Sequence, residues 1–382
     1  MAKVIPARPA PRRAPLHVCL TCIELFGDSI YGGFGRATRF IGRELVERGV
    51  RVSIVVPRRS PDYPDRYELD GIPVLQYRPD RPWQAVRVFR ELAADVYHSQ
   101  DTSLGTVLSR VARPSAAHVV TFRDPMDRGE WQVESAYANM PRLGWALYRQ
   151  FITNPFIAVA VRKADGLYCA AEFLIPKATE LYRLRRPARF LPSPVDLPPA
   201  IPKSARPTVC YVGRWEGRKR VELFFELARQ CPDVEFVAVG AARDPEHDRA
   251  LRERFGGIAN LRMTGVLDQF ATPEWGEVLG RSWVLVNTSA REGLPTAFIE
   301  AAAHRCAILS FTDPDGFATR FGHRAMEGRL EDGLRDLLRN DLWRERGEAG
   351  RRYVEQVFSI EHSMDAHIRA YETAVARAGG SR

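Results

Sequence analysis

The sequence has no run of apolar residues close to the ~18 that a membrane-spanning helix requires. Its first fifteen residues are basic and rich in Pro and Ala, but no apolar segment follows them, so we do not interpret them as a secretory signal. The six cysteines lack the spacing of a disulfide framework, and Cys19 and Cys22 form a CxxC pair inside an apolar run, where burial is the simplest interpretation. We therefore expect a cytoplasmic protein with a disordered basic tail over residues 1–15.

Excess negative charge is also missing, and the positive excess is one-sided. Residues 1–200 carry 29 Lys and Arg against 20 Asp and Glu, so the whole net charge of +9 lies in this half. Such an excess suggests an anionic partner, such as a membrane surface or an acidic substrate, although four of the cations lie in the tail. Nucleic acid is not expected as a partner, because the second half is neutral and no recognised nucleic-acid-binding module is present.

The first half alternates short apolar runs with helical patterns. Residues 17–22 and 50–56 are typical of buried strands, and residues 37–48 between them show helical spacing with Gly49 as a stop. Further strands are predicted at 74–77, 96–97, 119–122 and 165–170, and we expect the last of these to end this half. We predict one doubly wound α/β domain over residues 16–200.

Six prolines between residues 191 and 207 mark a linker, since Pro cannot serve a strand ladder and stiffens a connection. A second α/β domain is predicted over residues 201–358, and a final amphipathic helix lies within 359–382. The strands of this second domain are expected at 208–213, 234–240, 261–265, 284–287 and 307–311. Because ligands bind at the carboxyl ends of parallel strands, we expect a site in a cleft between the two domains.

A strand-to-helix turn carries the first candidate site. Glu292 precedes the turn and Glu300 lies on the following helix, while Pro295 suits the first helical position. Backbone N–H groups at a helix start and two carboxylates are suited to a polyhydroxylated, negatively charged molecule. Two Glu residues eight positions apart are common in helices, so the turn and the preceding strand carry the weight of this interpretation.

A basic turn carries the second candidate site. Arg214 and Lys219 follow a predicted strand and open a helix. Two cations at such a turn can hold a diphosphate and stabilise its charge as it leaves. A solvated basic turn is the alternative for either cation taken alone.

A glycine-rich loop from Gly32 to Arg36 is the third candidate, since it allows close approach of a phosphate to a helix start. It also resembles a broken dinucleotide-binding motif. The long loop before it and Arg58 after the second strand disfavour that alternative, although Arg58 leaves a 2′-phosphorylated dinucleotide open.

No metal site is expected. Asp313 and Asp315 form a DxD pattern, but Asp-Pro-Asp-Gly is also favourable turn chemistry, which we prefer. The histidines have no ligand spacing to one another.

Together these motifs resemble the retaining glycosyltransferases of the GT-B fold, of the family 4 type. The resemblance covers the chain after the tail: the glycine loop with Arg36, the Pro-rich hinge with Pro194, Val195 and Asp196, the basic turn and the Glu292/Glu300 pair. It implies two Rossmann-like domains facing across a cleft, a nucleotide-diphosphosugar donor, no cofactor and no metal. It also implies that the final helix crosses back to the N-terminal domain.

The resemblance further implies roles for individual residues. Arg214, Lys219 and Glu292 are the expected catalytic residues, and Glu300 is expected to hold the nucleotide ribose. The expected donor-binding set is Gly33, Gly35, Arg214, Lys219, Glu292, Gly293, Leu294, Pro295, Thr296 and Glu300.

The acceptor side departs from the family pattern. Arg123 and Asp124 stand where a His often precedes Asp, and together with Arg36 they are the acceptor-side candidates. We hypothesise that Arg123 contacts an anionic or phosphorylated acceptor. The predicted function is retaining transfer of a sugar to a glycan, lipid-linked or small-molecule acceptor, with peripheral membrane contact through the basic half as an open alternative. A non-catalytic nucleotide-sugar-binding protein of the same fold is the second hypothesis.

Overall fold

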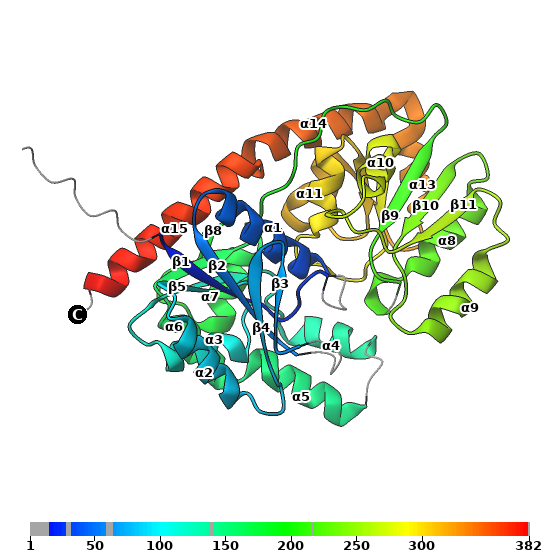
Figure 1. The fold of residues 1–382 in the computed structure, drawn as a ribbon. Helices are drawn as coiled ribbons and strands as arrows, with labels where there is room; N and C mark the ends of the chain where they lie inside the picture. The colour runs from blue at the N-terminus through cyan, green and yellow to red at the C-terminus, as the bar shows by residue number, and fades with distance from the viewer. Residues whose placement is uncertain (1–14, 28–31, 59–63, 138–140, 216, 381–382) are drawn as a thin grey trace, which may run out of the picture.

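The computed structural model describes residues 15–27, 32–58, 64–137, 141–215 and 217–380 (Figure 1). We predicted a disordered tail over residues 1–15. All of these residues except Pro15 lie outside the described part of the chain. In the described part of the chain, no helix is both long enough and apolar enough to cross a bilayer.

The N-terminal domain is built on an eight-stranded sheet. Its strand order is β3-β4-β2-β1-β5-β6-β7-β8, and only β3 runs antiparallel to its neighbour. The strands are β1 (His17–Thr21), β2 (Arg51–Pro57), β3 (Arg66–Leu69), β4 (Ile72–Tyr77), β5 (Val96–Ser99), β6 (Ala117–Phe122), β7 (Gly166–Cys169) and β8 (Arg189–Phe190). The helices are α1 (Gly33–Glu47), α2 (Trp83–Leu92), α3 (Leu104–Ala112), α4 (Arg128–Ala136), α5 (Arg142–Thr153), α6 (Pro155–Arg162) and α7 (Leu174–Tyr182).

The C-terminal domain has a six-stranded sheet, which is parallel throughout. Its strand order is β11-β10-β9-β12-β13-β14. The strands are β9 (Thr208–Val212), β10 (Glu235–Val239), β11 (Leu261–Gly265), β12 (Val284–Asn287), β13 (Ala307–Ser310) and β14 (Gly322–Arg324). The helices are α8 (Val221–Gln230), α9 (Pro245–Phe255), α10 (Glu274–Arg281), α11 (Thr296–Ala303), α12 (Phe317–Phe321), α13 (Leu330–Leu338) and α14 (Leu342–Val357), with short 3-10 turns at Gly217–Lys219, Pro314–Gly316 and Arg339–Asp341. The last helix, α15 (Ile360–Gly380), follows α14 and packs on the N-terminal sheet.

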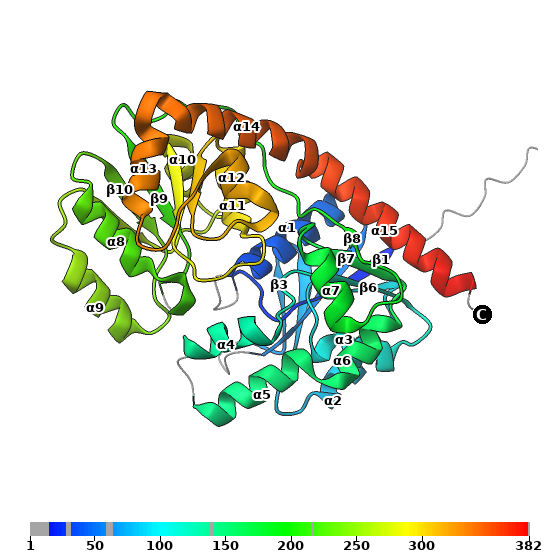
Figure 2. The ribbon, with the colours of Figure 1, turned by 180° about the vertical axis from the view of Figure 1, so that it is seen from behind.

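Helices cover both faces of each sheet, so the predicted fold class of two doubly wound α/β domains is confirmed (Figure 2). The central strands were predictable because a strand buried on both faces is a nearly continuous apolar run. Strands β3, β8 and β14 were missed, since they are short or lie at a sheet edge and lack such a run. The expectation that the strand near 165–170 ends the first half was wrong, because β8 adds one more strand.

Two chain segments cross between the domains. Helix α14 belongs to the C-terminal domain, and α15 continues from it onto the N-terminal sheet (Figure 2). There Met364 and Tyr371 are buried in the core formed by β1, β2 and β6. At the crossing point, the linker residue Val195 forms a β-bridge with Ser359. The two crossings are therefore bonded to each other at the hinge.

Candidate active site

The candidate donor turn follows β12 and ends at α11. Pro295 occupies the N-cap position with extended backbone, so α11 begins at Thr296, one residue later than the sequence suggested. Leu294 contacts apolar residues of both domain cores. The turn is therefore held between the two domains.

Glu292 of this turn lies against the basic turn. Lys219 Nζ donates to Glu292 Oε1 at 2.5 Å, and Asn287 Nδ2 approaches the same oxygen at 3.3 Å. The guanidinium of Arg218 lies 3.4 Å from Oε2. Burial acts to raise the pKa of Glu292, but Lys219 and Arg218 outweigh it and lower this pKa to about 2. Glu292 is thus an ionised hydrogen-bond acceptor over the whole physiological range.

Lys219 therefore forms an ion pair with Glu292, and the two candidate motifs meet at this point. Burial lowers the pKa of Lys219 from its usual value, while Glu292 opposes the shift. Arg214 is half-buried, and its backbone oxygen accepts from the Tyr211 hydroxyl at 3.1 Å. Tyr211 itself is packed in the core of the C-terminal domain, which fixes the backbone of the basic turn.

Two cations that the sequence analysis left unassigned join the domains. Arg291 is buried, and its guanidinium donates to Asp124 and, at 2.6 Å, to Glu134 of α4. Arg218 donates to the backbone oxygen of Arg291 at 2.7 Å and forms an ion pair with the same Glu134. Burial acts to lower the pKa of Arg291, but Asp124 and Glu134 outweigh it and raise this pKa above its usual value. Asp124 and Glu134 of the N-terminal domain therefore hold Arg291 and Arg218 in place next to the Lys219–Glu292 pair.

Glu300 lies on α11 and faces α1. Arg36 donates to Glu300 Oε2 at 2.9 Å, and the Arg36 guanidinium also stacks on the Trp275 ring, 4.5 Å from its centre. Both charged side chains are buried. Burial raises the pKa of Glu300, while Arg36 opposes the shift. Arg36, an acceptor-side candidate, is thus placed beside the residue predicted to hold the ribose.

Helix α1 begins at Gly33, four residues earlier than the sequence predicted, so Gly33 to Arg36 form its first turn and not a loop. This glycine-rich turn contacts the donor turn directly. Thr296 Oγ1 donates to the Gly33 backbone oxygen at 3.3 Å. A Cβ at Gly35 would lie 2.6 Å from the Phe26 backbone nitrogen, and one at Gly293 would lie 2.6 Å from the Arg123 backbone oxygen. Both positions therefore require glycine, because backbone from another segment occupies the space of a side chain.

The comparisons with known families divide the chain as the fold does. Residues 31–198 match the family model described as Glycosyltransferase Family 4, and residues 206–332 match the one described as Glycosyl transferases group 1. The two matches together cover most of the chain, which is a glycosyltransferase of the family 4 type. A search of curated proteins by sequence finds no match.

Solved structures resemble this glycosyltransferase over nearly its whole length. Sucrose-phosphate synthase from Thermosynechococcus elongatus is 17% identical with a TM-score of 0.72, covering 95% of this chain and 100% of that one. A TarM variant of S. aureus in complex with UDP is 12% identical with a TM-score of 0.66 (93% and 99% covered), and Anabaena HepE in complex with UDP and glucose is 11% identical with a TM-score of 0.64 (94% and 100% covered). At these identities the similarity shows the GT-B fold alone.

The DxD segment of the glycosyltransferase is a structural turn. The Asp313 carboxylate accepts from the backbone of Ala318 and Thr319, and the Asp315 carboxylate accepts from the backbone of Glu172 and Phe173 in the other domain. Among the described residues, no group of three or more His, Cys, Asp or Glu side chains is arranged to hold a metal ion. Cys19 and Cys22 are buried thiols whose pKa values are raised by that burial.

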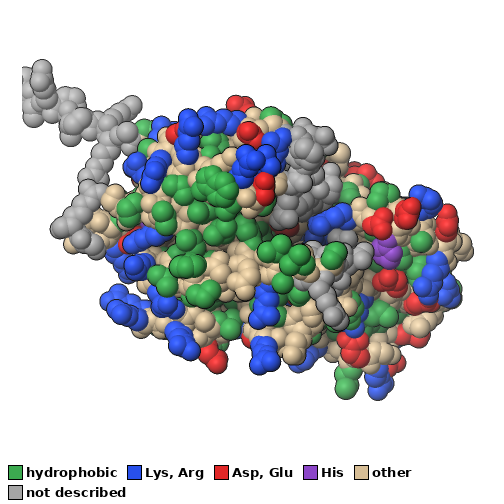
Figure 3. Space-filling model, turned by 90° about the horizontal axis from the view of Figure 1, so that it is seen from below, with side chains coloured by type: hydrophobic (Ala, Val, Ile, Leu, Met, Phe, Trp, Pro, Cys, Tyr) green, Lys and Arg blue, Asp and Glu red, His purple; other side chains and the backbone are tan. Residues whose placement is uncertain are grey.

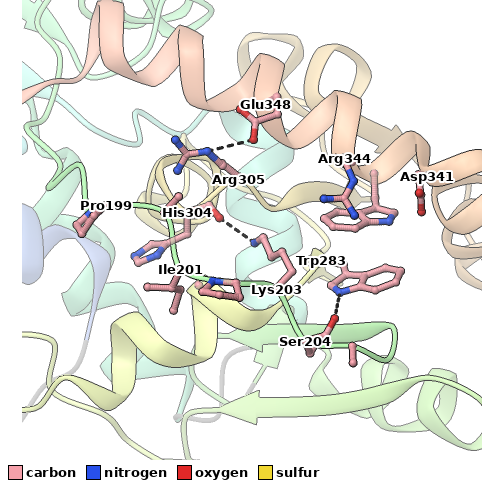
Figure 4. Close-up of a pocket in the computed structure, with 15 residues that line it drawn as sticks. Pro199, Ile201, Lys203, Ser204, Trp283, His304, Arg305, Asp341, Arg344 and Glu348 are labelled. Atoms are coloured by element: carbon pink, nitrogen blue, oxygen red, sulfur yellow. Dashed lines mark hydrogen bonds and ion pairs between the residues drawn. The ribbon is translucent and has the colours of Figure 1, made fainter.

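A separate cavity of about 550 Å³ lies under the linker, away from the donor turn (Figure 4). Lys203 fills its wall and donates to the backbone oxygens of Ser282 and His304, and Arg305 pairs with Glu348 at 3.1 Å. The Trp283 ring nitrogen donates to the Ser204 backbone oxygen. Lys203, Trp283, Arg305 and Glu348 each have a partner within the protein. We therefore interpret the cavity as the place where the linker packs on the C-terminal domain.

Arg123 lies inside the N-terminal domain and is 6% exposed. Its guanidinium donates to Ser193 at 2.9 Å and to Gln100, and burial lowers its pKa to about 10. Gln100 in turn approaches His98, which contacts Tyr371 of α15. The Arg123 side chain therefore connects the hinge and the crossing helix, while its backbone oxygen faces Gly293.

Replacing Arg123 by Ala is expected to lower the free energy of unfolding by about 2 kcal/mol, because Gln100 and Ser193 lose a buried hydrogen-bond partner. Urea unfolding measures the loss. Arg128, which is exposed at the start of α4, is the control, and its replacement by Ala should change stability by less than about 0.5 kcal/mol. Equal stability of the two variants would contradict the structural role of Arg123.

Proposed function

We propose that this glycosyltransferase moves a sugar from a nucleotide-diphosphosugar to an acceptor hydroxyl with retention of configuration, without a metal ion or cofactor. The observation that carries the proposal is the convergence of Lys219, Arg218 and Glu292 at the turn that leads to Glu300. Cations beside a carboxylate pair suit a diphosphate joined to two hydroxyl-bearing groups, a sugar and a ribose. HepE and TarM, whose structures contain UDP, support a nucleotide sugar as the donor.

In this proposal the acceptor oxygen attacks the anomeric carbon on the face from which the diphosphate departs. The bond between that carbon and the diphosphate oxygen breaks, the new glycosidic bond forms, and the acceptor proton passes to the departing diphosphate. Lys219 and Arg214 stabilise the charge that develops on the leaving group. Glu292 is ionised at neutral pH, so it suits accepting hydrogen bonds from sugar hydroxyls rather than supplying a proton.

The remaining donor contacts are assigned to Gly33, Gly35 and the turn from Gly293 to Thr296. The acceptor is proposed to enter from the N-terminal side, near Arg36 and the Arg123–Asp124 segment. It is a glycan, a lipid-linked or a small molecule. We propose a cytoplasmic location with peripheral contact between the basic N-terminal half and the inner membrane face. The six buried, unpaired thiols are consistent with a reducing compartment.

A panel of nucleotide-diphosphosugars tests the donor part of the proposal by thermal shift. At a concentration about 100-fold above Kd, a donor should raise Tm by on the order of 5 °C. If no member of the panel raises Tm, the proposal fails.

Slow donor hydrolysis without acceptor separates the enzyme from the alternative, a non-catalytic nucleotide-sugar-binding protein. We expect release of the nucleoside diphosphate at a rate above that of the Lys219→Met variant. If the donor binds but the unmodified chain hydrolyses it no faster than the Lys219→Met variant does, the non-catalytic binding protein is favoured.

A further inference from the structure

Helices α5 and α6 expose large apolar side chains to solvent. Leu143 and Leu147 of α5 are 72% and 63% exposed, and Phe156 of α6 is 72% exposed. Leu143 and Leu147 lie one helical turn apart, so they share a face of α5. Val159 of α6 is exposed as well. Isolated exposed apolar residues need no explanation, but a group on two consecutive helices marks an interaction surface.

The apolar residues that do pack in this region lie elsewhere on the same helices. Trp145 contacts Trp131 of α4, with ring centres 5.6 Å apart, and Ile157 of α6 is fully buried. The core of the domain therefore accounts for one side of α5 and α6. The exposed sides of the two helices, with Leu143 and Leu147 on α5 and Phe156 on α6, remain available to a partner.

The same segment carries positive charge only. No Asp or Glu occurs between Glu134 and Asp165, whereas Arg149, Arg162 and Lys163 are exposed. Figure 3 shows the side on which α5 lies, where apolar side chains gather over the N-terminal domain with Lys and Arg along its edge. Over the other domain, Asp and Glu are more frequent and lie among Lys and Arg. The local charge agrees with the excess of positive charge in the N-terminal half.

We propose that α5 and α6 bind an anionic lipid bilayer, with Leu143, Leu147 and Phe156 entering the boundary between headgroups and acyl chains. Arg and Lys side chains with long apolar stems reach the lipid phosphates from such a position. Binding would scale with the apolar area inserted and with the lipid charge. A second copy of the chain is disfavoured as the occupant, because a symmetric contact would bring Arg149, Arg162 and Lys163 of both copies together.

The position of this surface relative to the donor turn supports a membrane-held acceptor, a part of the inference that rests on the proposed function. Helix α4 lies between them: its Trp131 packs on Trp145 of α5, and its Glu134 bonds to Arg291 of the donor turn. A single helix thus connects the lipid-facing surface to the site where the donor sugar is expected. The surface itself does not depend on which sugar is transferred.

The test is co-sedimentation of the full chain with vesicles of phosphatidylcholine containing about 30% phosphatidylglycerol, and with phosphatidylcholine alone. We expect binding to the anionic vesicles, weakened by about 0.5 M salt. The double variant Leu143→Ser/Leu147→Ser should bind at least about tenfold more weakly, because it loses most of the inserted apolar area. Met326→Ser is the matched control, since Met326 is 74% exposed on the C-terminal domain.

Absence of binding to the anionic vesicles, or an equal loss in the Met326→Ser control, would overturn the proposal. So would a dimer in sedimentation velocity that the double variant abolishes, because a second copy would then be the occupant. Capture of an acidic protein instead of vesicles would overturn it too. Donor hydrolysis by the double variant should equal that of the unmodified chain. This activity separates a failure of the lipid surface from a failure of the proposed transfer.

Discussion

Replacing Lys219 by Met is expected to lower kcat about 10²–10³-fold, with a smaller effect on donor affinity. The Lys219 ammonium lies 2.5 Å from Glu292, at the turn where the donor diphosphate is proposed to bind. Its charge matters most when the diphosphate departs and gains negative charge, so the loss should fall on the chemical step rather than on ground-state binding. Steady-state kinetics with saturating donor measure it.

Arg220→Met is the matched control for Lys219→Met. Arg220 is the next residue in the chain, but its guanidinium bonds to Glu327 and to the Thr288 backbone, away from Glu292. This variant should keep kcat within about threefold of the unmodified enzyme. Lys219→Arg, which retains the charge, should recover part of the loss. If both Lys219 variants change only the donor KM, the cation does not act on the leaving group.

A folding defect must be separated from this kinetic effect, since Lys219 also pairs with a buried carboxylate. In Lys219→Met, Glu292 keeps Arg218 and Asn287 as neighbours. The expected stability loss is therefore only about 1–3 kcal/mol. A thermal unfolding curve with a single cooperative transition would show that the variant is folded.

The sequence predicted the fold well because the decisive signals are local. Strands such as β9, β12 and β13 are fully or almost fully buried parallel strands, and each is an apolar run that stands out from its neighbours. The Pro-rich segment between the domains is a local signal too. Strand β14 has three residues, Gly322–Arg324, of which Arg324 is exposed, so its pairing with β13 follows from the tertiary fold and not from its own composition.

The site was predictable only within each local motif and where two motifs follow paired strands of one sheet. Glu292 and Lys219 could be proposed as neighbours because each follows a central strand, and β9 and β12 pair in the sheet. Contacts between the domains have no such signal. Arg36 meets Glu300 across 264 residues, and Arg291 meets Asp124 across 167. The one available clue was Arg291 itself, a cation that follows the buried strand β12 closely, where burial requires an acidic partner.

The direction of the Arg123 side chain illustrates the same limit. Arg123 stands where the family often has a His before Asp, and this place suggested a group that contacts the acceptor. The side chain instead enters the domain and bonds to Gln100 and Ser193. Its partner Ser193 lies in the linker, 70 residues away, so no sequence spacing could have indicated this contact.

Replacing Glu300 by Gln is expected to weaken donor binding about 10–100-fold while kcat at saturating donor changes little. A hydrogen bond to a charged group contributes about 1.5–3 kcal/mol, and every 1.4 kcal/mol is a factor of ten in Kd. Arg36 contacts Oε2 of Glu300, so Oε1 is the oxygen proposed to accept a ribose hydroxyl. Gln keeps the shape of the side chain but not its charge. Isothermal titration with the donor measures the change.

The Arg36–Glu300 pair makes this prediction sharper, because Arg36 could act through Glu300 alone. If Arg36 only orients the carboxylate, then Arg36→Gln should weaken donor binding by less than Glu300→Gln, and the double variant should resemble Glu300→Gln. If Arg36 also contacts the acceptor, as its sequence position suggested, the single Arg36 variant should raise the acceptor KM in addition. An unchanged donor Kd in Glu300→Gln with a lower kcat would mean that Glu300 serves the chemical step instead of the ribose. The ion pair across the domains would then be part of the catalytic geometry, and Arg36→Gln should lower kcat with it.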